Sequence, residues 1–122
     1  MARHIVDEAK RCLQCKKPTC QKGCPINTSI PEMINLLLEG DIYGAGEVLF
    51  RNNPLSVICS LVCPHEKLCE GNCVLGVKSN PVHISAIEQY ISDYSLDILA
   101  LKPSKYKKGN IGIIGSGPAG IT

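Results

Sequence analysis

The chain has 122 residues, 8 of them cysteine, with one phenylalanine, no tryptophan and a formal net charge of +2. This length allows one small domain, and the weak charge does not indicate a nucleic-acid partner. No apolar run is long enough to cross a membrane, and the first residues lack the apolar segment of a secretory signal. We therefore expect a cytoplasmic protein with no membrane partner, in which patterned cysteine more often binds metal or acts in catalysis than it forms disulfides.

Apolar spacing and terminal signals predict three helices. The first follows Ser29, which forms a capping-box pattern with Glu32, and it ends at Gly40. Its apolar residues at helical spacing are Ile30, Ile34, Leu37 and Leu38. The second helix covers about 42–51 and the third about 83–100. The apolar stripe of the third consists of Ile84, Ile87, Ile91, Tyr94 and Ile98. The segments between these helices are expected to be loops and short helical turns, so the fold class is mainly α.

The eight cysteines form two groups with short spacings. The groups read Cys12-x2-Cys15-x4-Cys20-x3-Cys24-Pro25 and Cys59-x3-Cys63-Pro64-x4-Cys69-x3-Cys73. Soft thiolate ligands suit iron–sulfur clusters and zinc. A cubane cluster needs four ligands in an array wider than that around one ion, and three close cysteines with one remote cysteine supply it. Bacterial ferredoxins follow the same logic, because the cysteine before proline in their motif binds the other cluster.

Other uses of these cysteines are open at this stage. Two four-cysteine zinc sites could form, one of them from Cys12-x2-Cys15 with Cys20-x3-Cys24. Four disulfides would need an oxidising compartment, which nothing in the sequence indicates. A redox-active Cys-x-x-Cys pair of the thioredoxin type would not need the other six cysteines. The three lone histidines are weaker ligand candidates, namely His4, His65 and His83.

The last residues change character and indicate the start of a nucleotide-binding domain. We predict a cysteine-bearing domain over 1–102, a linker over 103–110 and the first strand of a Rossmann-type domain at the start of 111–122. The strand, 111–114, precedes a Gly-x-Gly-x-x-Gly pattern at Gly115, Gly117 and Gly120, which is typical of a turn that binds a pyrophosphate at a helix N-terminus. A complete dinucleotide-binding unit needs about 30 residues, so we expect an incomplete site and a piece of a longer enzyme.

Several segments in this order resemble one family of iron–sulfur domains. The matching segments are Arg11-Cys12-Leu13-Gln14-Cys15, Cys20-x3-Cys24-Pro25-Ile26-Asn27, Ile30-Pro31, Asn53-Pro54, Val62-Cys63-Pro64, Leu68-Cys69-Glu70-Gly71-Asn72-Cys73-Val74-Leu75, Pro81-Val82-x-Ile84 and the glycines of 115–120. The chain resembles the amino-terminal region of the small (beta) subunit of bacterial NADPH-dependent glutamate synthase. It is similar to the amino-terminal domain of dihydropyrimidine dehydrogenase and to the large subunit of electron-bifurcating NADH-dependent ferredoxin:NADP oxidoreductase.

The resemblance implies two [4Fe–4S] clusters in an α-helical ferredoxin-like domain, followed by FAD and NADPH domains. It also implies that the ligands are crossed between the two cysteine groups. The first cluster would be held by Cys12, Cys15, Cys20 and Cys73. The second would be held by Cys24, Cys63, Cys69 and Glu88. If the match to the family is shifted by one residue, Gln89 takes the place of Glu88. Cys59 is then a nearby free thiol, although counting alone would make it the eighth ligand. The Ser85-x-x-Glu88 pattern offers a second interpretation of Glu88, as part of a capping box.

The implied function is an electron relay in a flavin-dependent oxidoreductase. NADPH would reduce FAD, and the two clusters would pass electrons to a catalytic large subunit or another electron-accepting partner. A zinc-stabilised docking module is the alternative, and the same relay could serve a pyrimidine dehydrogenase or another reductase. No side chain is predicted to act as a catalytic acid, base or nucleophile. The basic residues around the first group either offset cluster charge, meet an acidic partner or form a solvated loop; they are Lys10, Arg11, Lys16, Lys17 and Lys22.

Overall fold

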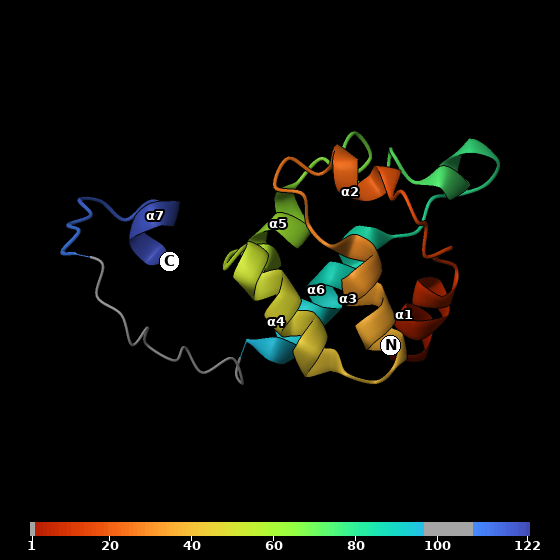
Figure 1. Cartoon of the computed structure of the whole chain (residues 1–122), viewed down its shortest axis with the longest axis horizontal. Coiled ribbons are helices and arrows are strands. Elements are labelled where there is room, and N and C mark those ends of the chain that lie inside the picture. The colour runs from red at the N-terminus through yellow and green to blue at the C-terminus, as the bar shows by residue number, and fades with distance from the viewer. Residues whose placement is uncertain (1, 97–108) are drawn as a thin grey trace.

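Helices form all the regular secondary structure that the computed structural model describes, which covers residues 2–96 and 109–122 (Figure 1). In chain order they are α1 (Ala2–Lys10), α2 (Thr19–Gly23), α3 (Ile30–Leu38), α4 (Ile42–Asn52), α5 (Ser56–Val62), the 3-10 helix η1 (Val74–Val77), α6 (Ile84–Ser95) and α7 (Pro118–Ile121). The predicted mainly α class is therefore confirmed. None of these helices has the length and apolar character that a membrane crossing requires.

The core lies between α3, α4 and α6. Helix α4 packs against both α3 and α6, while α1 packs against α3 and α6, and α5 packs against α6. The largest fully buried side chains are Ile30, Met33, Ile34, Leu49, Val82, Ile84, Ile87 and Ile91. Burying each such aliphatic side chain stabilises the fold by about 1.5–3 kcal/mol. None of these side chains is aromatic, so each contributes less buried area than a Phe or Trp would. The core is therefore modest, as the low aromatic content of the sequence predicts.

The first two predicted helices are present with small differences at their ends. Ser29 precedes α3 as expected, but its side chain makes no capping hydrogen bond, so the capping-box prediction there is wrong. The backbone oxygen of Ser29 instead accepts a hydrogen bond from Met33 N at 3.0 Å. Helix α4 extends one residue beyond the predicted 42–51. The Asp41 carboxylate begins α4 by accepting a hydrogen bond from Gly44 N at 2.8 Å.

The third predicted helix is α6, with a buried face that differs from the predicted stripe. Ile84, Ile87 and Ile91 are buried, but Tyr94 is 56% exposed and Ser95 is buried in its place. The reason is close packing, because a Cβ atom on Gly46 of α4 would overlap the Ser95 side chain. Two small residues thus let the helices approach at a point where tyrosine would not fit. The predicted position Ile98 lies outside the described residues.

The predicted strand at 111–114 is absent from the described residues 109–122. A strand is defined by hydrogen bonds to a neighbouring strand, and no described residue provides one. The glycine turn and the helix start are present. Gly115 has a φ of 123°, which favours glycine, and α7 begins directly after Gly117 with Pro118 in its first turn. Residues 103–108 of the predicted linker lie outside the described residues.

Candidate metal centres

All eight cysteines are free thiols on short segments around two cavities near the N-terminal halves of α3 and α6. Seven of them are half-buried and Cys69 is buried. The sequence therefore folds so that helices supply the walls while loops and short helices supply the sulfur atoms. No described residues form a group of three His, Cys, Asp or Glu side chains arranged to hold a single metal ion.

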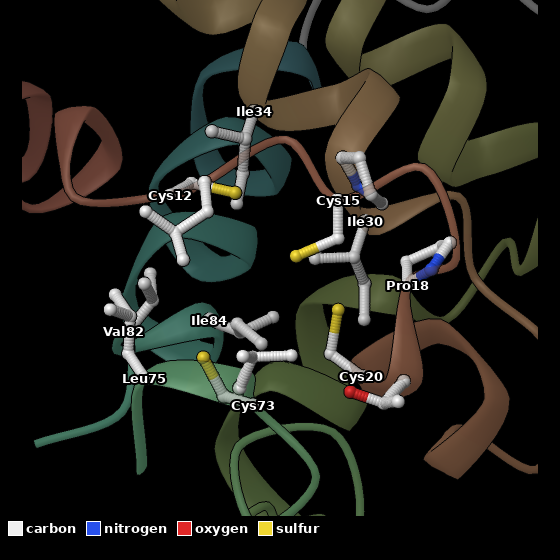
Figure 2. Close-up of a pocket in the computed structure, with 14 residues that line it drawn as sticks. Cys12, Cys15, Pro18, Cys20, Ile30, Ile34, Cys73, Leu75, Val82 and Ile84 are labelled. Carbon is white, nitrogen blue, oxygen red and sulfur yellow. The ribbon is translucent and has the colours of Figure 1, made fainter. Parts of the chain in front are cut away.

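The first cavity collects four thiols, and Figure 2 shows their sulfur atoms turned toward one shared space. These are Cys12, Cys15, Cys20 and Cys73. Its walls are mainly apolar, and the aliphatic lining is Leu13, Ile30, Ile34, Val74, Leu75, Val82 and Ile84. The free volume is about 20 Å³, which holds about one water molecule.

Burial and neighbouring thiols raise the pKa values of two thiols in the first cavity, Cys12 and Cys20. Burial is the main cause that raises the pKa of Cys20 to about 11, and the neighbouring Cys73, Cys12 and Cys15 raise it further. The pKa of Cys12 is also raised, by burial first and then by Cys15 and Cys73. These sulfurs are therefore gathered without a compensating positive charge. A bound cation would reverse the effect, because metal ligation requires the thiolate form.

The second cavity has a free volume of about 150 Å³ and collects four cysteines and one carboxylate. These residues are Cys24, Cys59, Cys63, Cys69 and Glu88, and His65 also lines the cavity. Gln89, the alternative to Glu88, does not line it. Cys59 lies on α5, Glu88 on α6 and the remaining cysteines on the loops between helices. The second cavity therefore contains all four residues of the implied second ligand set together with the spare thiol.

Glu88 is a buried carboxyl group that faces these thiols. Its side chain belongs to a residue only 8% exposed, and burial raises its pKa to about 7. No described residue donates a hydrogen bond to this carboxyl group. Burial raises the pKa of Cys63 to about 11 and that of Cys69 to about 12, and in both cases Glu88 and Cys24 raise the pKa further. A cation in the cavity would stabilise the charged forms of all these groups.

The two cysteine groups are crossed between the cavities. Cys24 belongs to the first group along the chain but lines the second cavity, whereas Cys73 belongs to the second group and lines the first cavity. The cause is contact between α2 and the segment 68–73. Thr19 Oγ1 donates a hydrogen bond to the backbone oxygen of Asn72 at 2.5 Å, and a Cβ atom on Gly23 would overlap the Asn72 side chain.

Two polar residues next to the cavities were not identified from the sequence. The Asn53 amide donates a hydrogen bond to Cys59 Sγ at 3.0 Å. The Asn53-Pro54 motif is the sequence signal at this position. Glu70, quoted only as part of the Cys69–Cys73 motif, is 9% exposed and accepts hydrogen bonds from Ser85. The capping-box interpretation of Ser85 and Glu88 is wrong, because α6 begins at Ile84 and Ser85 lies inside it.

The basic residues around the first group have different surroundings. Arg11 pairs with Glu8 at 2.6 Å and also donates hydrogen bonds to the backbone oxygens of Asn80 and Pro81. It therefore holds the end of α1 next to the start of α6. Lys10 lies 3.7 Å from Asp7, with both side chains largely exposed. The remaining three lysines, Lys16, Lys17 and Lys22, are exposed on the surface.

Comparison with known proteins identifies the family. Residues 1–98 match the family described as dihydropyrimidine dehydrogenase domain II, 4Fe-4S cluster. The chain belongs to this family. It is 39% identical over 119 residues to the glutamate synthase [NADPH] small chain of Azospirillum brasilense, covering 94% of this chain and 25% of the relative.

Two further relatives extend the comparison. The glutamate synthase [NADPH] small chain of Escherichia coli is 38% identical over 118 residues, which cover 93% of this chain and 25% of that protein. The NAD-dependent dihydropyrimidine dehydrogenase subunit PreT of Salmonella typhimurium is 33% identical over 118 residues, which cover 95% of this chain and 29% of that protein. The chain thus spans between a quarter and a third of the length of these relatives. The relatives are oxidoreductase subunits, and the resemblance inferred from the motifs is confirmed.

Proposed function

We propose that this 4Fe-4S domain binds two [4Fe–4S] clusters and relays single electrons between FAD and a catalytic partner. The proposed ligands of the first cluster are Cys12, Cys15, Cys20 and Cys73, and those of the second are Cys24, Cys63, Cys69 and Glu88. When bound, the clusters supply one-electron chemistry, and the chain supplies ligands and surroundings. We assign this role to residues 1–102, with 103–110 as a linker and 111–122 as the start of an FAD domain.

The observation that carries the proposal is the pair of cavities, each lined by the four proposed ligands of one cluster and by cysteines from both groups. Their donor chemistry fits a cluster, since seven thiols are soft ligands and one carboxylate is an anionic ligand that helps set the reduction potential.

The surroundings of the two sites differ in ways that matter for electron transfer. Aliphatic residues such as Ile34 and Ile84 line the first cavity and place apolar side chains next to the sulfur atoms. The second cavity is larger, and its walls include Thr28 and His65. Solvent access and hydrogen bonds to ligands both shift the reduction potential of a cluster. We infer that the two sites have different potentials, which a directional relay between them needs.

We base a proposal for the complete protein on its relatives. Their names include glutamate synthase [NADPH] small chains and NAD-dependent dihydropyrimidine dehydrogenase subunits. We propose that the complete protein binds FAD and NADPH, that Gly115, Gly117 and Gly120 contact the FAD pyrophosphate, and that a catalytic large subunit accepts the electrons. Eight free cysteines fit the reducing cytoplasm as the site of this activity.

Elemental analysis of anaerobically prepared protein tests the proposal. About eight iron atoms and about eight acid-labile sulfides per chain are expected, because each [4Fe–4S] cluster contributes four of each. About two zinc ions and no sulfide would instead establish the zinc-stabilised docking module and overturn the relay. Preparation without oxygen matters, since cluster loss in air would leave thiols free to oxidise.

A further inference from the structure

Glu70 joins the segment that carries ligands for both cavities to the helix that carries Glu88. It follows Cys69, which lines the second cavity, and precedes Cys73, which lines the first. Its carboxylate Oε1 accepts hydrogen bonds from Ser85 N at 2.9 Å and from Ser85 Oγ at 2.7 Å. Resting on the proposed function, we propose that Glu70 is a positioning residue that sets the placement of the two clusters relative to each other.

The first argument is the local electrostatics at the start of α6. The first backbone N–H groups of a helix have no partner within the helix, and the helix dipole favours negative charge at this end. Ser85 is the second residue of α6, so the Glu70 carboxylate satisfies one of these donors. Because Glu70 is 9% exposed, water does not replace it easily. A hydrogen bond to a charged acceptor in such surroundings is stronger than a neutral one.

The second argument is the distance along α6 from Ser85 to Glu88. Three residues at about 1.5 Å rise each amount to roughly one helical turn. Ser85 and Glu88 therefore move together, and any shift of α6 along its axis would move the Glu88 carboxylate by the same distance relative to Cys69. By holding Ser85, Glu70 fixes the separation of these two proposed ligands. The backbone oxygen of Glu70 also accepts a hydrogen bond from Cys73 N at 3.0 Å, so the same residue links Cys73 of the first cavity to α6.

The segment around Glu70 is itself rigid, so it can act as an anchor. The backbone N–H groups of Glu70 and Gly71 both donate hydrogen bonds to the His65 backbone oxygen, at 2.9 and 3.1 Å. A Cβ atom on Gly71 would overlap the backbone of Glu66, so the chain there is in close contact with itself. Cys69 is buried in the core cluster. A tight turn attached to α6 through one carboxylate is a well-defined link between two ligands.

The test compares Glu70→Ala, Glu70→Gln and the matched control Glu66→Ala, which removes an exposed carboxylate from the same segment. In Glu70→Ala we expect the Ser85 amide to exchange with deuterium at least about tenfold faster in the metal-free chain, because its charged acceptor is lost. Glu70→Gln should restore most of the slow exchange, since the neutral amide oxygen still accepts, and Glu66→Ala should match the unaltered chain. Equal exchange in all four proteins would overturn the proposal.

Electron paramagnetic resonance of the reduced, cluster-loaded chain supplies the second measurement. Glu70→Ala should change the magnetic interaction between the two clusters, which depends on their separation, while Glu70→Gln and Glu66→Ala should leave it unchanged. Ser85→Ala, which removes only the hydroxyl donor, should produce a smaller change and serves if Glu70→Ala folds poorly. If the unaltered chain binds about eight iron atoms but its interaction is the same in every variant, this inference fails and the relay stands. If the unaltered chain binds no iron, the relay itself fails.

Discussion

The Asn53 side chain donates a hydrogen bond to Cys59, with Nδ2 and Sγ 3.0 Å apart. Asn53 is held in place because its Oδ1 accepts a hydrogen bond from Leu55 N, also at 3.0 Å. Cys59 therefore has a protein partner at the edge of the second cavity. Glu88 differs, because it is buried in the same cavity and no described residue donates to its carboxyl group. The two candidates for the eighth ligand therefore differ in burial and in their protein partners, and the family resemblance implies Glu88.

Substitution of these two residues separates the possibilities. Cys59→Ala should retain both cluster signals and full iron content, whereas Glu88→Ala should change or remove the signal of the second cluster. Gln89→Ala is the matched control, because Gln89 neighbours Glu88 without lining the cavity. Electron paramagnetic resonance of the reduced proteins makes the comparison. Loss of a cluster signal in Cys59→Ala but not in Glu88→Ala would show that our assignment is wrong.

The crossed arrangement predicts which cluster each cysteine affects. Cys73→Ser should alter the same signal as Cys12→Ser, because both residues line the first cavity. Cys24→Ser should alter the same signal as Cys63→Ser, because both line the second. The four spectra, with iron content, decide the matter. If Cys24→Ser instead affects the signal that depends on Cys12, the ligands are grouped by sequence and the crossing is wrong.

The stability of the metal-free protein should depend on pH through Glu88. Burial raises its folded-state pKa from 4.5 to about 7. The stability that the protonated Glu88 contributes is therefore fully present below 4.5, its pKa in the unfolded chain, and is lost as the pH rises through about 7, its pKa in the folded chain. From pH 4.5 to pH 8 the free energy of unfolding should fall by about 2–3 kcal/mol on account of this group.

Urea unfolding of the metal-free protein at the two pH values measures this loss, and Glu88→Gln supplies the reference. Subtracting the variant removes the contributions of the other titrating groups, because they are shared by both proteins. An equal pH dependence in the unaltered protein and in Glu88→Gln would contradict the prediction. Glu66→Gln, at an exposed carboxylate, should keep the full dependence.

The close contact between α4 and α6 predicts a sensitive glycine. Gly46→Ala should lower the free energy of unfolding by about 1–3 kcal/mol, because its Cβ atom would overlap Ser95. Glu47→Ala is the control in the same helix, since the Glu47 side chain is exposed and pairs with Arg51 at the surface. Thermal unfolding measures both. A Gly46→Ala protein as stable as the unaltered chain would show that the helices can move apart without loss.

Local patterns predicted much of the helical structure. Apolar spacing and terminal residues located α3, α4 and α6 because these signals act within a few residues along the chain. Helix α1 and the length of α5 were not predicted. The exposed Tyr94 shows the limit of spacing, because the small side chains at Gly46 and Ser95 decide how α6 faces its neighbour.

The sequence by itself determined the ligand chemistry, since two closely spaced cysteine groups provide soft anionic donors wherever the chain folds. Only the tertiary structure decided which thiols share a cavity. That choice depends on contacts such as the hydrogen bond from Thr19 to Asn72, which joins residues 53 positions apart. It also brings Glu88 on α6 to Cys69 and attaches Glu70 to Ser85. Spacing along the chain does not encode such distances, because packing of the helices sets them.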